Sequence, residues 1–487
     1  MRRRENVAFF GPPWYSDRKH RIGGPFMEKY LSKKEILGYS LGLFGFQAIV
    51  GLLNSYQAEF YGSIMGADLA VIGILILVVK VLSSFFDPVV GGMIQKKQGP
   101  KGKLRPFILY SLLPLFVLTV VIFVKVPLTG AALYAYIFIT FLLWSMAMTL
   151  GDVPSQGIAS VLTPNPTERT NVISIANTAK QIGFSASAVL VPVVCIIVPM
   201  GSKVLVKKGE TDSPISATEY LVTAIVTAAL GCLLFSLIYL WNKERVPYEG
   251  EAMKTREMFA TLRANKPLML VIISYFLGAG RQMQMAIQVQ TSNALLGSQN
   301  FVIVLGITMA IGSMASMALT PLLIKKLGEK KVFIGLSVYG FIVSMTAFLI
   351  FAFVTKAPVV MFIFFFLIGL NAGAFTLMPM IMVADCVDYS EYTTGKRTEG
   401  PAFSLLTLTI KVCLAVGAAL GLIFVSLSGY RADAVATDST KNMIYFAYTA
   451  MPGIFNLLAV FPILKYDISG AKKQEIAAEL QKRRESK

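Results

Sequence analysis

Apolar stretches long enough to cross a membrane recur along the whole chain and restrict what it can fold into. A spanning helix needs ~20 predominantly apolar residues. An open sheet cannot satisfy its backbone hydrogen bonds in hydrocarbon, so such spans must be helices. Of the 487 residues 55% are hydrophobic and only 15% charged, which is too apolar for one soluble core. The sequence predicts an all-α polytopic membrane protein. Its twelve expected transmembrane helices cover residues 36–62, 69–96, 106–126, 130–163, 172–200, 215–241, 267–295, 300–324, 332–354, 357–386, 402–427 and 441–464.

The net charge of +18 would suit a nucleic-acid-binding protein, but its distribution favours membrane topology instead. With an even number of spans, both termini and every second loop lie on one side, and that side carries 34 of the 45 Lys and Arg residues. Loops rich in Lys and Arg remain in the cytoplasm. We therefore expect a multi-pass protein of the cell membrane (inner or plasma membrane), in contact with membrane lipids. Both termini are expected in the cytoplasm, with no nucleic-acid partner.

The spans divide into two sets of six. Basic loops, KKQGPKGKLRP and KKLGEKK, follow the second span of each half, which suits two related bundles with a central site, although any short cytoplasmic loop tends to be basic. The start of the chain is basic and broken by Gly and Pro, so we expect it to lack fixed structure, with Met27 as the working start. The expected organisation is a cytoplasmic tail (1–35), a six-helix bundle (36–241), a cytoplasmic linker (242–266), a second six-helix bundle (267–464) and a cytoplasmic tail (465–487).

The residues that catalysis or metal binding would need are scarce. Cys195, Cys232, Cys386 and Cys413 lie in or at the ends of expected spans without metal-ligand spacing, and the only histidine, His20, is in the tail. No Gly-rich phosphate-binding motif is present. The sequence argues against an enzyme. It predicts no cofactor and no metal, apart from a transported Na⁺ in case sodium is the coupling ion.

Three charged residues stand out inside expected spans: Lys411 in LLTLTIKVCLAV, Asp87 in FFDPVVGG and Asp152 in MTLGDVPSQG. A charge near the bilayer centre costs at least ~2.5–3.5 kcal/mol, so it usually faces a polar cavity and a partner. The two aspartates are the natural partners of Lys411. A carboxylate pair in a low-dielectric cavity can hold a proton or a small cation, and a nearby ammonium sets its affinity. These charges favour a transporter, and a purely structural ion pair is the alternative.

Polar residues also form stripes on single faces of the expected helices. An isolated Ser or Thr more often serves helix packing, but together the stripes predict a polar cavity whose hydroxyls and amides offer a sugar directional hydrogen bonds. The stripes comprise Gln47, Asn54, Ser55 and Glu59 on the first span, Lys80, Ser83, Ser84 and Asp87 on the second, and Ser145, Thr149, Asp152 and Gln156 on the fourth. They continue with Ser174, Asn177, Thr178, Lys180, Gln181 and Ser185 on the fifth span, Ser274, Arg281, Gln284 and Gln288 on the seventh, and Ser404, Thr407 and Lys411 on the eleventh.

Several segments resemble one transporter family. FFDPVVGGMIQKKQGPKGKLRPFIL, GDVPS around Asp152, and MVADCVDYSEYTTGKRTEGPAFSLLTLTIKV are similar to the second span and its loop, the fourth-span Asp-x-Pro motif, and the tenth-to-eleventh-span region of the glycoside–pentoside–hexuronide:cation symporters. The resemblance covers residues 30–465. It implies the twelve-helix major facilitator fold, with two six-helix bundles that move by alternating access.

Matching positions imply roles for individual residues. Asp87 resembles a cation-site carboxylate, Asp152 an aspartate shared by the cation and sugar sites, and Lys411 the eleventh-span lysine that links the two. A second set resembles the charge network that closes the cytoplasmic gate. The alternative for this second set is ordinary surface ion pairs, each worth only ~0–1 kcal/mol. The expected gate residues are Arg169, Asp385, Asp388, Glu391 and Arg397.

The chain departs from the melibiose-type pattern of this family at four positions. Gln47 replaces a sugar-binding aspartate, Ser83 a second cation-site carboxylate, Asn177 a sugar-binding arginine, and Gln156 a stacking tryptophan. The loss of one carboxylate weakens the case for sodium and shifts the expectation toward protons. Lys180 and Arg281 could contact an anionic substrate such as a hexuronide, so melibiose itself is a poor expectation.

We therefore expect a secondary active symporter that imports a glycoside-type sugar, neutral or acidic, coupled to H⁺ or Na⁺. The alternatives are a carrier of the same fold for another solute such as an amphipathic lipid, and an uncoupled uniporter. The cation site is expected at Asp87, Asp152 and Ser83. The substrate site is expected at Gln47, Asp152, Gln156, Asn177, Lys180, Arg281, Thr407 and Lys411.

Overall fold

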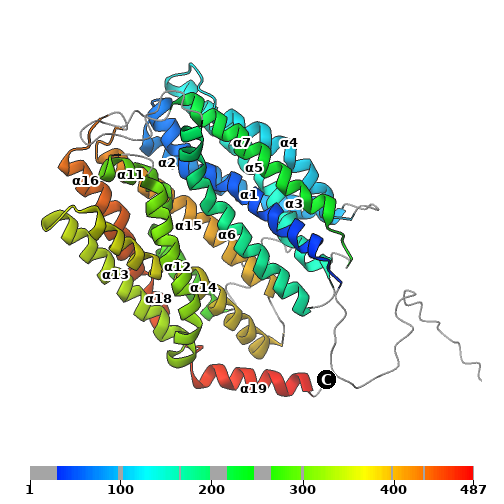
Figure 1. The fold of residues 1–487 in the computed structure, drawn as a ribbon. Coiled ribbons are helices and arrows are strands. Elements are labelled where there is room, and N and C mark those ends of the chain that lie inside the picture. The colour runs from blue at the N-terminus through cyan, green and yellow to red at the C-terminus, as the bar shows by residue number, and fades with distance from the viewer. Residues whose placement is uncertain are drawn as a thin grey trace, which may run out of the picture.

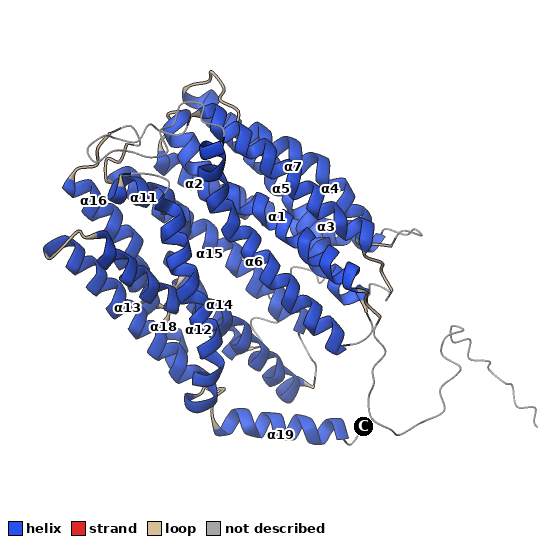
Figure 2. Cartoon of the chain, in the orientation of Figure 1, coloured by secondary structure: helices blue, strands red, loops and turns tan. Residues whose placement is uncertain are grey.

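The computed structural model describes residues 30–96, 102–163, 166–197, 216–245, 265–297, 301–395, 399–431 and 434–485. Within these ranges the regular structure is helical, with no strand. Figure 2 shows the helices gathered in one elongated bundle. The all-α fold that the sequence predicts is confirmed. Most of the expected N-terminal tail, including Met27, and most of the expected linker lie outside the described residues.

The first half of the chain contributes seven helices to the described structure. Ser32 caps the first of these, and its side chain accepts a hydrogen bond from the backbone of Glu35, so α1 begins three residues before the predicted span. The helices are α1 (Lys33–Glu59, continued by a π-helical turn, Phe60–Ile64), α2 (Leu69–Ser84), α3 (Phe86–Lys96), α4 (Arg105–Ile122), α5 (Gly130–Leu162), α6 (Pro166–Ile197) and α7 (Ala217–Trp241).

The second half follows the same plan with more interruptions. Its elements are α9 (Lys266–Leu277), η2 (Ala279–Gln282), α10 (Met283–Ala286), α11 (Gln288–Leu296), α12 (Val302–Leu327), α13 (Glu329–Phe353), α14 (Pro358–Thr394) and α15 (Glu399–Leu427). They continue with α16 (Asp438–Tyr445), η4 (Phe446–Ala450), α17 (Met451–Leu458), α18 (Val460–Leu464) and α19 (Ala471–Glu485).

Ten of the described helices, some counted together with their continuations, are long and apolar enough to cross a membrane, by length and composition. The seventh expected span corresponds to the shorter apolar helix α9 followed by η2, α10 and α11. Within the described residues each predicted stretch overlaps helical structure, but the full count of twelve spans stays a prediction.

Two helix breaks position the residues that matter below. Between α2 and α3 the break falls at Phe85, just before the Asp87–Pro88 pair. Proline has no backbone N–H and clashes with the preceding turn, so a continuous helix is disfavoured here. Asp87 therefore lies in the first turn of a new helix. In the seventh expected span, α9 ends at Leu277 with Gly278 as its C-cap, and a 3₁₀ turn follows.

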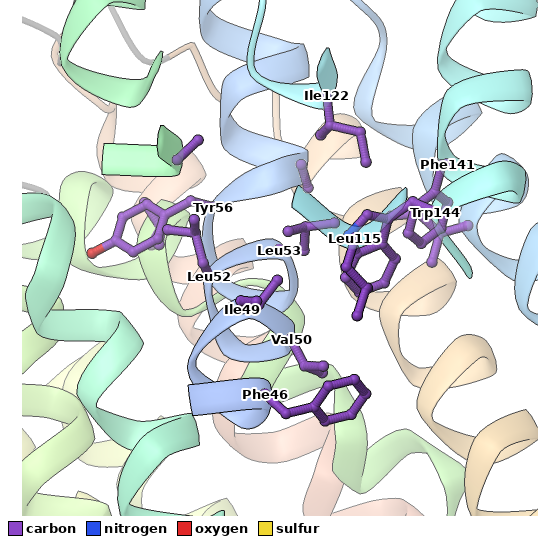
Figure 3. Close-up of a cluster of buried hydrophobic side chains, with 14 of the residues drawn as sticks. Phe46, Ile49, Val50, Leu52, Leu53, Tyr56, Leu115, Ile122, Phe141 and Trp144 are labelled. Carbon is purple, nitrogen blue, oxygen red and sulfur yellow. The ribbon is translucent and has the colours of Figure 1, made fainter. Parts of the chain in front are cut away.

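Small residues allow the helices to pack closely. A Cβ on Gly183 of α6 would lie 2.3 Å from the carbonyl oxygen of Phe44 in α1. A Cβ on Gly73 of α2 would lie 3.0 Å from the carbonyl oxygen of Ala419 in α15, so the two halves of the chain touch backbone to backbone at this crossing. Around α1, Figure 3 shows Leu53 near Leu115 and Trp144 in the buried cluster. The Trp144 indole N–H also donates to the Thr119 hydroxyl at 2.9 Å.

The bundle has two distinguishable ends. We call the end where α1 begins and α14 finishes the terminal end, and the opposite end, where α1 and α15 finish, the distal end. Helix α19 lies across the terminal end of the second half (Figure 1). Ile476 and Leu480 of α19 are buried in a cluster with residues of α14 and α15. Part of the expected C-terminal tail is therefore a docked helix.

Candidate functional site

A central cavity of about 340 Å³ lies between the two halves of the chain. Its wall comes from α1, α2, α5 and α6 on one side and from η2, α10 and α15 on the other. The polar stripes predicted on the first, second, fourth, fifth and eleventh spans all contribute to it. Its polar lining residues are Gln47, Asn54, Gln57, Lys80, Ser83, Ser145, Thr149, Asp152, Lys180, Gln181, Gln282, Thr407 and Lys411.

An ion pair joins the two halves beside this cavity. The Lys411 ammonium on α15 donates to Oδ2 of Asp87 on α3, and the Thr149 hydroxyl on α5 donates to Oδ1 of the same carboxylate at 3.1 Å. The side chains of Lys411 and Asp87 are 25% and 26% exposed, so the pair is partly screened from water. The partnership predicted between these two charges is present. Both carboxylate oxygens of Asp87 are engaged by the protein.

Asp152 lies one helical turn beyond Thr149 and is buried, with 6% of its surface exposed. Its Oδ2 accepts a hydrogen bond from Nε2 of Gln156 at 2.8 Å. Thr149, which binds Asp87, and Asp152 lie one turn apart on α5 and both line the cavity, so Asp87 of α3 approaches the same face of α5. The structure thus brings Asp87, Asp152 and Lys411 together, as predicted.

Two further lysines line the cavity. Lys80 lies on α2, with its ammonium 5.9 Å from the centre of the Phe141 ring, and Lys180 lies on α6. Lys80 is one turn before Ser83 on α2, and Asp87 follows the helix break at Phe85. Sequence reasoning placed Lys80 on the correct face of its span but did not include it in the site. Its position inside an apolar run was the available signal.

Three expected substrate residues do not line this cavity. Gln156 is exposed and holds Asp152, and Asn177 is exposed about one turn nearer the terminal end than Gln181. Arg281 is directed into the second half, where its guanidinium lies 4.1 Å from the centre of the Phe375 ring and 3.5 Å from Oδ1 of Asn456. The structure gives Arg281 a packing role, and a substrate role for these three residues stays a prediction.

The distal end is bridged between the halves. The Tyr430 hydroxyl near the end of α15 donates to Oε1 of Glu59 on α1 at 3.4 Å, and Asn293 of α11 donates to the Tyr430 oxygen at 2.8 Å. Close by, the Ser426 hydroxyl donates to Oδ1 of Asp68, the N-cap of α2, at 3.3 Å. These contacts join the two halves at the distal end, beside the buried Glu59 carboxylate.

At the terminal end two of the expected gate residues, Arg169 and Asp385, form contacts within their own halves. Arg169 donates to the Thr163 carbonyl at 3.0 Å, and Asp385 binds the Lys473 ammonium of α19 at 2.8 Å. Lys473 also binds Glu329 at the start of α13. Asp388 and Glu391 lie half-buried on α14, whereas Arg397 falls outside the described residues. The sequence predicted that Asp385 belongs to a charge cluster at this end but did not predict its partner Lys473. Lys473 lies on a short polar helix, which has no apolar stretch by which it could be recognised in the sequence.

Comparisons with known proteins place this geometry in a family. The chain is 26% identical over 468 residues to the glucuronide carrier protein homolog of Escherichia coli (strain K12), an alignment that covers 94% of this chain and 97% of the relative. It is 24% identical over 454 residues to the isoprimeverose transporter of Lactiplantibacillus pentosus, covering 91% and 90%. A crystal structure of the nucleoside transporter NupG superposes with a TM-score of 0.63 at 15% identity, covering 90% of this chain and 100% of that one. That likeness concerns the fold alone.

The sequence profile described as "MFS/sugar transport protein" matches residues 38–470, which is most of the chain. The chain therefore belongs to this family, whose members are transporters and not enzymes, and within it to the glycoside–pentoside–hexuronide branch of the major facilitator symporters.

Proposed function

We propose that this protein imports a glycoside-type sugar through the central cavity, coupled to a cation by alternating access. The observation that carries the proposal is the Lys411–Asp87 ion pair, which links the two halves beside a cavity lined by amides and hydroxyls. A cavity of about 340 Å³ falls in the range of sites that enclose small molecules. The named relatives, a glucuronide carrier homolog and an isoprimeverose transporter, support a sugar as the solute.

The charges of the cavity favour a substrate with an acidic group. Lys411 is neutralised by Asp87, and of the remaining lining charges Lys80 and Lys180 are positive while Asp152 is negative. An excess cation in a low-dielectric cavity attracts an anion. A glycoside with one carboxylate, such as a hexuronide, would supply that charge and hydroxyls for Gln47 and Thr407. The amphipathic lipid alternative fits less well because charged and amide side chains line the wall.

The terminal end faces the cytoplasm in this proposal, as the distribution of Lys and Arg indicates. The distal contacts of Tyr430 and Ser426 then close the outer side, so the described arrangement is the one that releases substrate inward. Rocking of the halves would break these contacts and bring the terminal-end charges of the two halves together. The protein acts in the cell membrane.

Uptake into proteoliposomes tests this function. Purified protein is reconstituted and offered neutral and acidic glycosides, with proton and sodium gradients imposed separately. We expect accumulation of an acidic glycoside above its external concentration under at least one gradient. Exchange of internal for external substrate without accumulation under either gradient would point to a uniporter and contradict coupling.

The variant Asp87→Cys sharpens the test. It removes the carboxylate that pairs with Lys411, so gradient-driven accumulation should be lost while exchange of substrate across the membrane persists. Continued accumulation by this variant would contradict the role of Asp87 in coupling.

A further inference from the structure

Asp152 has one carboxylate oxygen engaged by the protein and one left over. The residue lines the central cavity from α5, and only 6% of its surface is exposed. Its Oδ2 accepts a hydrogen bond from Nε2 of Gln156, one helical turn further along α5, at 2.8 Å. Among the described residues no donor reaches Oδ1. Oδ1 is therefore the oxygen that remains for a ligand in the cavity.

The helix backbone beneath this carboxylate is held in place. The Ser155 hydroxyl donates to the Asp152 carbonyl at 2.8 Å, and the Ser155 carbonyl accepts from the Tyr39 hydroxyl of α1 at 3.1 Å. Next to it, a Cβ on Gly151 would lie only 2.9 Å from Oγ of Ser111 in α4, so α5 packs closely against the rest of the first half. The terminal torsion of an aspartate side chain is soft and roughly two-fold. With the backbone fixed, the hydrogen bond at Oδ2 is what selects one orientation of the carboxylate.

Gln156 lies on the side of Asp152 that faces the terminal end. Helix α5 finishes at that end, where Arg245 donates to the Leu162 carbonyl and to the Glu35 carboxylate of α1. Gln156 is one turn nearer this end than Asp152, and its side chain is exposed while Asp152 is buried. The amide thus gives Oδ2 a donor in place of water, whose loss on burial would otherwise be costly.

We propose that Gln156 is the positioning residue of Asp152: its amide fixes the carboxylate so that Oδ1 accepts a hydrogen bond from a hydroxyl group of the sugar. The inference rests on the proposed function, to which it adds how this hydroxyl group is bound. An acceptor that is already ordered binds more tightly than one that must be ordered at the moment of binding. A hydrogen bond that served only the helix would change the stability of α5 and not the affinity for substrate.

The variant Gln156→Met removes the donor and keeps the length of the side chain. Binding of phenyl glucuronide to the purified protein is measured together with its uptake into proteoliposomes. We expect the Kd and the KM to rise about 10-fold, since a hydrogen bond that orders a charged acceptor is lost. The maximal rate of uptake and the melting temperature without sugar should change little. A lower melting temperature with unchanged affinity overturns the proposal.

The variant Gln156→Glu gives a readout that a structural role would not move. It places a second carboxyl group beside Asp152. At about pH 6 a proton shared by the two groups takes the place of the amide hydrogen, whereas at about pH 8 two ionised carboxylates repel each other. The ratio of the variant's Kd to the wild-type Kd should therefore rise about 10-fold between these pH values. A ratio that does not change with pH overturns the proposal.

The ratio is needed because other groups also titrate. It cancels effects that are common to both proteins, such as those of a coupling proton. The other titratable side chains around this part of the cavity are Tyr39 on α1, Lys80 on α2, Asp87 on α3, Lys180 on α6 and Lys411 on α15.

A double-mutant cycle shows whether Gln156 acts through Asp152. In the Asp152→Asn background, Gln156→Met should change the Kd by less than about 2-fold. An undiminished effect in that background means that Gln156 contacts the sugar itself, which overturns the positioning role. Where Asp152→Asn binds too weakly to compare, the pH dependence of Gln156→Glu decides.

The outcomes separate this inference from the proposed function. A wild-type protein that accumulates no glycoside under any gradient refutes symport. A wild-type protein that transports phenyl glucuronide, together with Gln156 variants that bind it normally, refutes only the role of Gln156.

Discussion

Replacing Lys473 with methionine should loosen the terminal end of the second half. The Lys473 ammonium binds two carboxylates, Glu329 and Asp385, whose side chains are only 8% and 10% exposed. Burial acts to lower the pKa of Lys473, but the hydrogen bonds and charges of Asp385 and Glu329 outweigh it and raise that pKa. The ammonium is therefore charged at neutral pH. Its loss would leave two neighbouring acidic side chains without the cation between them.

The magnitude follows from the exposure of the partners. Removing one member of a fully buried ion pair costs about 3–5 kcal/mol. The Lys473 side chain is 37% exposed, so solvent screening reduces this to about 1–2 kcal/mol. Because Lys473 joins α19 to the start of α13 at Glu329 and to α14 at Asp385, this free energy opposes local undocking of α19. A loss of that size increases the undocked fraction by about 5–30-fold.

Hydrogen exchange of the α19 amides measures this local opening. In the Lys473→Met protein, exchange within residues 471–485 should accelerate by about 5–30-fold, with little change in α1 or α5. The matched control is Lys472→Met, because the adjacent Lys472 ammonium pairs with the exposed Asp467 and lies 5.4 Å from the centre of the Tyr389 ring of α14, a contact of about 0.5–1 kcal/mol. An exposed pair contributes about 0–1 kcal/mol, so its exchange should change little. Equal effects of the two substitutions would refute the assignment of the anchoring role to Lys473.

Three further predictions concern the packing and the closure of the bundle. Gly183→Val should lower the melting temperature and the yield of folded protein, because even a Cβ would approach the Phe44 carbonyl to 2.3 Å, and overpacking typically costs about 1–3 kcal/mol. Trp144→Phe should cost about 1 kcal/mol or more in thermal unfolding, since the buried Thr119 hydroxyl loses its indole donor; Trp14→Phe, in the N-terminal tail, is the control. Tyr430→Phe removes the hydroxyl that joins Glu59 and Asn293 and should therefore let the distal end open more often. A cysteine introduced at Ser145 in the central cavity reports this opening. Its reaction with an impermeant thiol reagent added from outside should become about 5-fold faster. An unchanged labelling rate would show that this hydroxyl does not hold the distal end closed.

The fold was predictable because the hydropathy of a short sequence window is enough to locate a membrane-spanning helix. In the part of the chain that the structure describes, each apolar stretch expected to cross the membrane overlaps a helix. The polar faces of the first, second, fourth, fifth and eleventh spans converge on one cavity. Their positions depend only on helical periodicity and on the cost of exposing charge to lipid. The pairing of Lys411 with Asp87 was predictable for the same reason, since an isolated charge in a span needs a partner.

Arg281 shows where this reasoning stops. Ser274, Arg281 and Gln284 of its predicted stripe do share one face, because each hydrogen-bonds to the last expected span, at Ala459, Asn456 and Tyr448 respectively. Helical periodicity groups residues on a face, but it does not tell whether that face meets the cavity or a neighbouring helix. Here the stripe faces the second half, and Gln282 of the 3₁₀ turn lines the cavity instead. The docking of α19 was missed for a different reason: only tertiary contacts from Ile476 and Lys473 distinguish it from a solvated tail.

The Lys411–Asp87 ion pair gives a physical reason why substrate occupancy can control the movement of the two halves. Lys411 belongs to α15 in the second half and Asp87 to α3 in the first, while α15 also meets α2 backbone to backbone at Gly73. The pair is therefore a contact between the bodies that must move. In a low-dielectric site neither charge is left without a partner cheaply. An acidic substrate that attracts Lys411 must leave Asp87 with another positive partner, and a coupling cation is such a partner. The substrate then takes Lys411 as its partner, and the cation takes Asp87. Each ligand supplies a partner for the charge that the other would leave unpaired, so binding of either one favours binding of the other. This mutual effect is the thermodynamic requirement for coupled transport.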